Sequence, residues 1–122
     1  MKLMIDDDLV YRKTPNGFYR VTTVPEAIDY LDRLERHVEL SEVLLDNDLG
    51  EDTLEGYKFL EALIEGDRDV HIEWLNIHSR NTVAVAKMVA YLESARRHGI
   101  AITDRITTLT LEDYMRLTND SY

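Results

Sequence analysis

Hydrophobic and polar positions along the chain alternate in blocks that predict short strands and longer helices in turn. Apolar runs over residues 2–5, 42–46 and 70–77 have the length of buried strands, and each run stops at polar residues. Segments 25–38 and 53–66 instead carry apolar residues at helical spacing, as amphipathic helices do. Strands and helices therefore alternate along most of the chain.

Local signals mark the ends of the first elements. Pro25 suits the first turn of a helix, and Thr53 can cap the next one. Residues 9–13 and 18–23 flank Thr14–Gly17, whose Asn-Gly pair tolerates the positive φ of a tight turn. We expect an irregular hairpin in this part of the chain.

The second half of the chain continues the alternation. A third helix follows residue 78 and has Ser79 or Asn81 as its cap. Residues 100–103 have the pattern of one more strand, which 106–109 can extend. Thr110–Asp113 has the capping-box pattern that starts a short helix.

This alternation predicts an α/β fold with three layers, in which helices flank a parallel β-sheet. Crossovers between parallel strands are helical and right-handed, so helices cover the sheet. A chain of 122 residues, 44% of them hydrophobic, is long enough for one core. We expect a single domain over 1–122, with a core of about 2–103 and a C-terminal extension over 104–122. Ligands of such sheets bind at the carboxyl ends of the strands.

Charge and composition limit the kinds of partner and site that this chain can have. The chain has 14 Lys and Arg against 24 Asp and Glu, a formal net charge of −10, which disfavours binding of duplex DNA. It has no cysteine, which excludes disulfides, thiolate zinc sites and thiol nucleophiles. Its apolar runs are too short for a membrane span, so we expect no membrane partner and a cytoplasmic location.

Polar side chains follow three of the predicted strands, as Asp6–Asp8, Asp46–Asp48 and His78–Ser79. If these strands are parallel neighbours, their ends meet at one edge, where the carboxylates repel one another unless a cation neutralises them. Oxygen ligands of this kind suit Mg²⁺ or Mn²⁺. The candidate metal ligands are Asp6, Asp7, Asp46 and Asp48.

Ordinary structural roles are open to the same residues. Acids after a strand are often solvated or cap a helix, His78 can be a buried hydrogen-bonded histidine, and Ser79 can be a cap. A calcium-binding EF-hand does not fit 46–50, because the glycine comes one position too early. The metal site rests on the expected convergence of three strand ends.

The strand ends resemble those of response-regulator receiver domains over about 2–103, which implies a flavodoxin-like fold. The resemblance implies that Asp6, Asp7 and Asp46 bind Mg²⁺ and that Asp46 accepts a phosphoryl group. Receivers end their fifth strand in a lysine, which this chain lacks at 102–104, and a hairpin replaces their first helix. The missing lysine disfavours ordinary two-component signalling.

A closer resemblance is to the cyclic-phosphate processing receiver domains. The similar segments are Asp6-Asp7, Arg12, Pro15–Gly17, Arg20–Thr23, Asp46–Gly50 and His78–Asn81. The resemblance implies a receiver-like fold and processing of cyclic or terminal nucleotide phosphates. The Asn-Pro-x-Gly continuation of the family is replaced here by Asn81–Ala84.

These observations predict a metal-dependent phosphoesterase whose partner is a nucleotide or an RNA-end phosphate. Asp46 and His78 are the candidate catalytic residues, because a metal on the carboxylates activates water and a histidine transfers protons near neutral pH. The candidate phosphate-binding residues are Arg12, Arg20, Ser79 and Asn81.

Other functions fit the same sequence. A non-catalytic degenerate receiver would bind a nucleotide or a protein partner, with Tyr11, Phe18 and Tyr19 able to stack on a base. A viral or mobile-element protein that sequesters a nucleotide signal would carry the same residues. The tail after Thr103 closes the sheet, covers an edge or forms a homodimer contact.

Overall fold

The computed structural model describes residues 1–8, 12–34, 36–47 and 55–119. In these ranges the chain forms, in order, β1 (Lys2–Ile5), β2 (Phe18–Val21), α1 (Val24–Asp32), β3 (Val38–Asp46), α2 (Glu55–Glu65), β4 (Val70–His78), α3 (Thr82–Arg97), β5 (Thr103–Leu109) and α4 (Leu111–Asn119). The predicted cap Thr53 and the predicted ligand Asp48 lie outside the described residues.

The strands form one parallel sheet in the order β2-β1-β3-β4-β5. Ile5 of β1 pairs with Leu45 of β3, and Asp46 pairs with His78 of β4. The carboxyl ends of the three central strands therefore lie at one level. The predicted α/β fold with a parallel sheet is confirmed.

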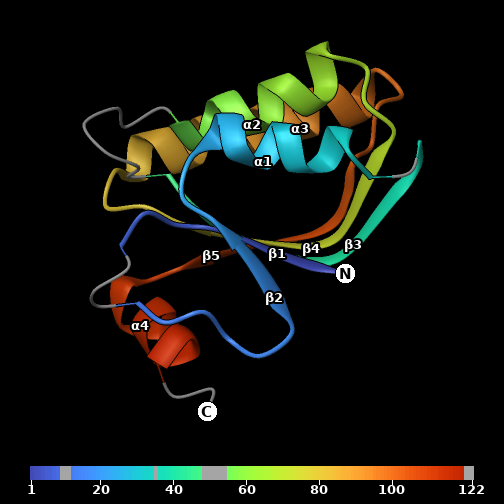
Figure 1. Cartoon of the computed structure of the whole chain (residues 1–122). Coiled ribbons are helices and arrows are strands. Elements are labelled where there is room, and N and C mark those ends of the chain that lie inside the picture. Colours follow the sequence, from blue (N-terminus) through green and yellow to red (C-terminus); the bar gives the residue numbers. More distant parts are fainter. Residues whose placement is uncertain (9–11, 35, 48–54, 120–122) are drawn as a thin grey trace.

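Helices cover the two faces of the sheet unequally. Figure 1 shows α1, α2 and α3 on one face and α4 alone on the other. The main core lies under the three helices, where Leu45, Phe59 and Met88 are fully buried. A smaller cluster of Met4, Leu44 and Tyr114 lies under α4. None of the helices that the structure describes is long and apolar enough to cross a membrane.

The connection from β1 to β2 contains no helix in its described residues, 6–8 and 12–17. Gly17 has a φ of 87°, and the Phe18 amide donates to the Pro15 carbonyl at 3.2 Å, so the predicted tight turn is present. It leads into β2, which pairs with β1 in parallel. The hairpin itself stays a prediction, because 9–11 lie outside the described residues.

Two element boundaries differ from the sequence-based expectation. Helix α1 ends at Asp32, and Val38, expected on that helix, is the first residue of β3. Val38 and Leu40 are buried in the sheet, which outweighs their helical spacing. The last strand runs over 103–109 rather than 100–103, as an edge strand whose Asp104 and Arg105 are exposed. The expected helix start at Thr110 is present, since the Asp113 amide donates to Thr110 Oγ1 at 3.1 Å.

Candidate functional site

The carboxyl edge of the sheet brings together three of the predicted acids. One ligand atom from each of Asp6, Asp7 and Asp46 lies within 4.8 Å of the others. Asp6 and Asp46 are buried at the ends of β1 and β3, and Asp7 is exposed. Such a set of oxygen donors could hold a hard divalent cation. The expected convergence of these strand ends is confirmed.

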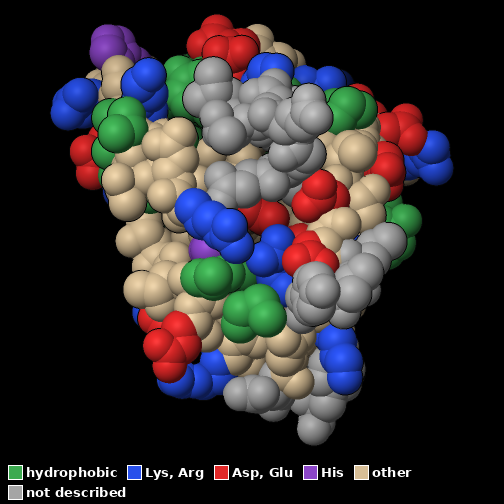
Figure 2. Space-filling view, turned by 90° about the vertical axis from the view of Figure 1, so that its left-hand side faces the viewer, with side chains coloured by type: hydrophobic (Ala, Val, Ile, Leu, Met, Phe, Trp, Pro, Cys, Tyr) green, Lys and Arg blue, Asp and Glu red, His purple; other side chains and the backbone are tan. Residues whose placement is uncertain are grey.

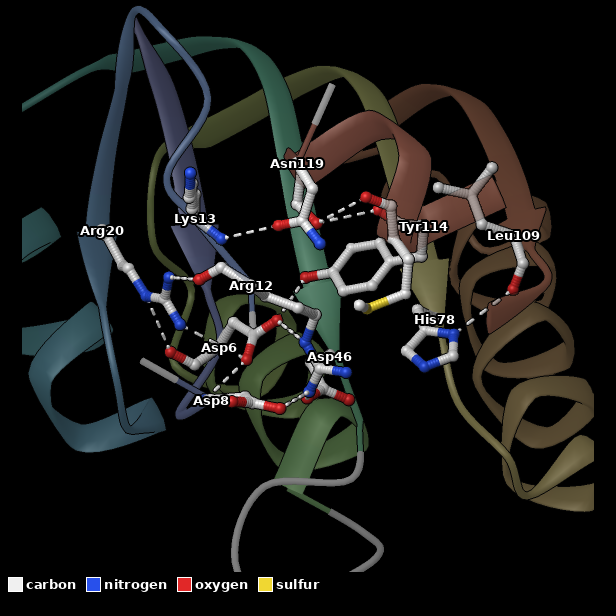
Figure 3. A network of polar contacts seen from close by, with 12 residues as sticks. Asp6, Asp8, Arg12, Lys13, Arg20, Asp46, His78, Leu109, Tyr114 and Asn119 are labelled. Carbon is white, nitrogen blue, oxygen red and sulfur yellow. Dashed lines mark hydrogen bonds and ion pairs between the residues drawn. The ribbon is translucent and has the colours of Figure 1, made fainter. Parts of the chain in front are cut away.

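Asp6 is the centre of a buried hydrogen-bond network (Figure 3). Its Oδ2 accepts from Arg12 Nε and from the Tyr114 hydroxyl, both at 2.7 Å. Its Oδ1 accepts from the Asp8 amide at 2.8 Å and lies 3.5 Å from Arg20 Nη2. Both oxygens of Asp6 thus have hydrogen-bond donors, one of them the Arg12 guanidinium, so this carboxylate fixes the positions of its neighbours.

Arg12 bridges the two buried acids. Besides its bond to Asp6, its Nη2 lies 3.0 Å from Asp46 Oδ2, and its side chain is only 11% exposed. Burial alone would lower its pKa, but the hydrogen bond to Asp6 and the attraction of both carboxylates outweigh burial and raise the pKa. A permanent cation thus stands beside Asp46.

Arg20 holds the backbone next to Asp6 and Arg12. Its Nε donates to the Asp6 carbonyl at 3.1 Å, and its Nη1 donates to the Arg12 carbonyl at 2.6 Å. The Arg20 guanidinium therefore holds the backbone that carries Asp6 and Arg12. Sequence analysis grouped Arg20 with the phosphate-binding residues, whereas these contacts assign it a supporting position.

A cavity of about 630 Å³ opens over the acids at the surface. Its described lining residues are Asp7, Asp8, Arg12, Asp46, His78, Arg80 and Asn81. Figure 2 looks onto this edge of the molecule, where acidic and basic side chains meet in the middle of the face. Carboxylates and guanidinium groups thus share one hollow, as binding of a metal with a phosphate requires. Sequence analysis missed Arg80, which lies between the candidates Ser79 and Asn81.

His78 ends β4 and is almost fully buried. Its Nδ1 lies 3.5 Å from the Leu109 carbonyl, and its ring stacks on Tyr114 with 4.7 Å between centroids and 14° between planes. The stacking on Tyr114 fixes the orientation of the His78 ring at the wall of the cavity.

The turn after His78 is organised by its own polar side chains. Asn81 is the N-cap of α3, and its Oδ1 accepts from the Ala84 amide at 3.1 Å. Ser79 Oγ accepts from the Asn81 amide at 3.0 Å and from Asn47 Nδ2 at 3.4 Å. The choice left open for the cap is thereby decided in favour of Asn81, which also lines the cavity.

Asn47 links the end of β3 to the start of α2. Its Oδ1 accepts from the Gly56 amide at 2.9 Å, and Asn47 is fully buried. A Cβ at Gly56 would lie 2.6 Å from that oxygen, so only glycine permits this approach. The contact fixes the backbone directly after Asp46.

Tyr114 of α4 is a site residue that sequence analysis assigned only to the tail. It is fully buried, and its ring also lies 5.4 Å from the Arg12 guanidinium carbon. Burial and the negative charge of Asp6 raise the Tyr114 pKa well above its ordinary value, so its hydroxyl remains a donor. No local motif predicts this role, because Asp6 and Tyr114 lie 108 residues apart in the chain.

A family model described as "Cyclic-phosphate processing Receiver domain" matches residues 1–94. No curated protein and no solved structure matches the chain. The matched range contains the ends of β1, β3 and β4, whereas β5 and α4, with Tyr114, follow it.

Proposed function

Because this chain belongs to the cyclic-phosphate processing receiver family, we propose that it is a metal-dependent phosphoesterase acting on a nucleotide or RNA-end phosphate. The observation that carries this proposal is the group of Asp6, Asp7 and Asp46, with ligand atoms within 4.8 Å, beside Arg12 in one cavity. The family description names cyclic-phosphate processing, and we extend the proposal to terminal phosphates of nucleotides and RNA.

The chemistry of the donor set fits Mg²⁺ or Mn²⁺. Asp7 and Asp46 would be the main ligands, since Asp6 already accepts hydrogen bonds at both oxygens. The three carboxylates outnumber the guanidinium groups of Arg12 and Arg20, so one more cation is electrostatically favoured. When bound, such an ion polarises phosphoryl oxygens and lowers the pKa of a coordinated water.

The protein's own side chains supply anion binding and proton transfer. Arg12 and Arg80 line the cavity and would pair with phosphoryl oxygens. In opening a cyclic phosphate, the oxygen of water bonds to phosphorus and one bond from phosphorus to a ribose oxygen breaks. His78 would take the proton that the attacking water loses and pass it to this ribose oxygen as its bond to phosphorus breaks, and Tyr114 would hold the His78 ring in place.

Turnover of 2′,3′-cyclic AMP and of 3′-phosphorylated oligoribonucleotides with Mg²⁺ or Mn²⁺ tests the proposal. We expect Asp46→Asn and His78→Gln each to lower kcat by about 100-fold or more, because each removes a group at the reacting phosphate. Glu112→Gln is the matched control, since Glu112 lies on the exposed side of α4 and should leave turnover unchanged. Absence of turnover across both substrate types would refute the proposal.

A second candidate function is nucleotide binding without catalysis. The observation that favours it is the ion pair of Arg12 with Asp46, which already neutralises one oxygen of the central acid. A nucleotide that raises the Tm of the protein with no turnover would support this function instead. Tyr19, expected to stack on a base, stacks on Tyr30 with 4.1 Å between centroids, and Tyr11 lies outside the described residues.

A further inference from the structure

A second hollow lies between α3 and the edge strand β5. Its volume is about 600 Å³, and its walls are mostly apolar, formed by Ile77, Val85, Ala86, Val89, Ala90 and Leu109. Its other described lining residues are Ser79, Thr82, Thr108, Thr110 and Glu93. We call this hollow the α3–β5 groove. Apolar walls with a few polar groups are the usual composition of a site for a small organic ligand.

The α3–β5 groove adjoins the charged cavity over the acids. His78, Arg80 and Asn81 line the cavity, whereas Ile77, Ser79 and Thr82 line the groove. Neighbouring residues of a strand face opposite sides, so the end of β4 contributes to both hollows.

Ser79 marks the boundary between the two hollows. Ser79 lines the groove, and its Oγ accepts a hydrogen bond from Asn47 Nδ2 at 3.4 Å. Asn47 directly follows the candidate catalytic residue Asp46 in the chain. The turn at the end of β4 is thus the wall that the charged cavity and the apolar groove share.

We propose that the α3–β5 groove binds the base and ribose of the nucleotide whose phosphate lies in the charged cavity. This inference rests on the proposed function and adds the position of the nucleoside. A nucleotide joins an anionic group to a flat, weakly polar ring, and the two adjoining hollows have these two characters. The small side chains of Ala86 and Ala90 leave room for the ring against α3.

Isothermal titration calorimetry of the whole chain with 5′-AMP and with inorganic phosphate, both with Mg²⁺ present, tests the inference. We expect AMP to bind about tenfold or more tightly than phosphate, because the groove adds apolar contacts with the base. Equal affinities, or no measurable binding of AMP, would overturn the inference.

Ala86→Trp fills the groove, and Val83→Trp is its matched control on the same helix, at a side chain that is 64% exposed. We expect Ala86→Trp to reduce AMP affinity to that of phosphate and Val83→Trp to leave it unchanged. AMP binding that is unchanged in Ala86→Trp would overturn the inference. If Ala86→Trp does not fold, methyl NMR shifts of Val85, Val89 and Leu109 in the wild-type protein on adding AMP decide the matter, with no shift counting against it.

Turnover of p-nitrophenyl phosphate separates this inference from the proposed function, because that substrate carries no nucleoside. Retained turnover in Ala86→Trp, with AMP binding lost, supports both proposals. AMP binding in the groove without any turnover in the wild-type protein supports the inference and refutes the enzyme. A concentration-dependent dimer that AMP does not affect and that Ala86→Trp abolishes would assign the groove to a second copy of the chain and overturn the inference.

Discussion

Charged side chains connect neighbouring strands at both ends of the sheet, but in opposite surroundings. At the carboxyl edge, Asp6 and Asp46 are fully buried and share Arg12. At the amino edge, Glu39 of β3 binds His37 at 2.9 Å and His71 of β4 at 2.8 Å. Asp69 and Asp104 bind the other ring nitrogens of these histidines at 2.8 and 3.0 Å.

The two clusters contain ion pairs of similar length, so they differ mainly in how far water reaches their charges. Water screens the amino-edge cluster, where the Glu39 side chain is 59% exposed. At the carboxyl edge little water reaches the charges, so each one depends on its partner. Burial therefore separates the two clusters. At the carboxyl edge the buried charges are stabilised by one another, whereas at the amino edge water also stabilises them.

The largest expected effect comes from removing Asp6. Asp6→Ala leaves the Arg12 guanidinium without its main partner, and we expect it to lower the free energy of unfolding by about 3–5 kcal/mol. Urea denaturation followed by circular dichroism measures the change. The control is Asp104→Ala at the exposed amino edge, where a loss of similar size would contradict the distinction between the two edges.

Arg12→Met removes the buried cation and keeps a side chain of similar reach. Since Arg12 neutralises Asp46 in the absence of a metal, we expect Mg²⁺ to bind about tenfold more tightly to the variant. Calorimetric titration with MgCl₂ alone gives the affinity. Arg116→Met, which breaks the exposed pair with Glu112, should leave Mg²⁺ affinity unchanged. Weaker Mg²⁺ binding in Arg12→Met would show that Arg12 and the metal do not compete.

Tyr114→Phe tests the link between α4 and the site. The variant keeps the ring against His78 and removes the donor to Asp6, so we expect a loss of about 1–2 kcal/mol in the free energy of unfolding. We also expect kcat to fall with little change in KM, because the reacting groups lose their alignment. Tyr91→Phe is the matched control, since its hydroxyl donates to Glu65 at the exposed surface. Equal effects of the two substitutions would contradict a role for burial.

The smallest expected effect is a pH dependence at the amino edge. Hydrogen bonds to Asp69 and Glu39 raise the His37 pKa, and bonds to Glu39 and Asp104 raise the His71 pKa. A raised pKa in the folded state means that the stabilisation is complete below about 6.5, the ordinary value for histidine. It is lost as the pH rises through the raised values.

At acidic pH the stability contributed by this cluster changes in the opposite direction with pH. Hydrogen bonds from His71 and His37 lower the Glu39 pKa, so the contribution of Glu39 is lost as the pH falls through that lowered value. Histidine resonances followed by NMR against pH, with urea denaturation at the same pH values, measure both changes. His71→Gln should reduce the loss of unfolding free energy above pH 6.5. The control His98→Gln should leave this loss unchanged, since His98 contacts a backbone carbonyl. An unchanged pH dependence above 6.5 in His71→Gln would contradict the contribution of His71 to this loss.

Local patterns in the sequence were enough to predict the alternation of strands and helices, the parallel sheet and the acids at its carboxyl edge. These features follow from local patterns, because a buried apolar run that ends in Asp6 or Asp46 predicts where a strand leaves the core. The family resemblance, which the match over 1–94 confirms, rests on the same segments. Parallel pairing then makes the convergence of the acids a consequence of topology.

Which other residues surround these acids became clear from the folded chain alone. Arg12 and Asp46 are 34 residues apart and Asp6 and Tyr114 are 108 apart, so no helical or strand period relates them. Val38 joined a strand against its helical spacing, because the sheet buries it. The groove along α3 likewise depends on how closely a helix packs on an edge strand. Packing and burial are properties of the whole chain, and they turned a list of candidate residues into one arrangement.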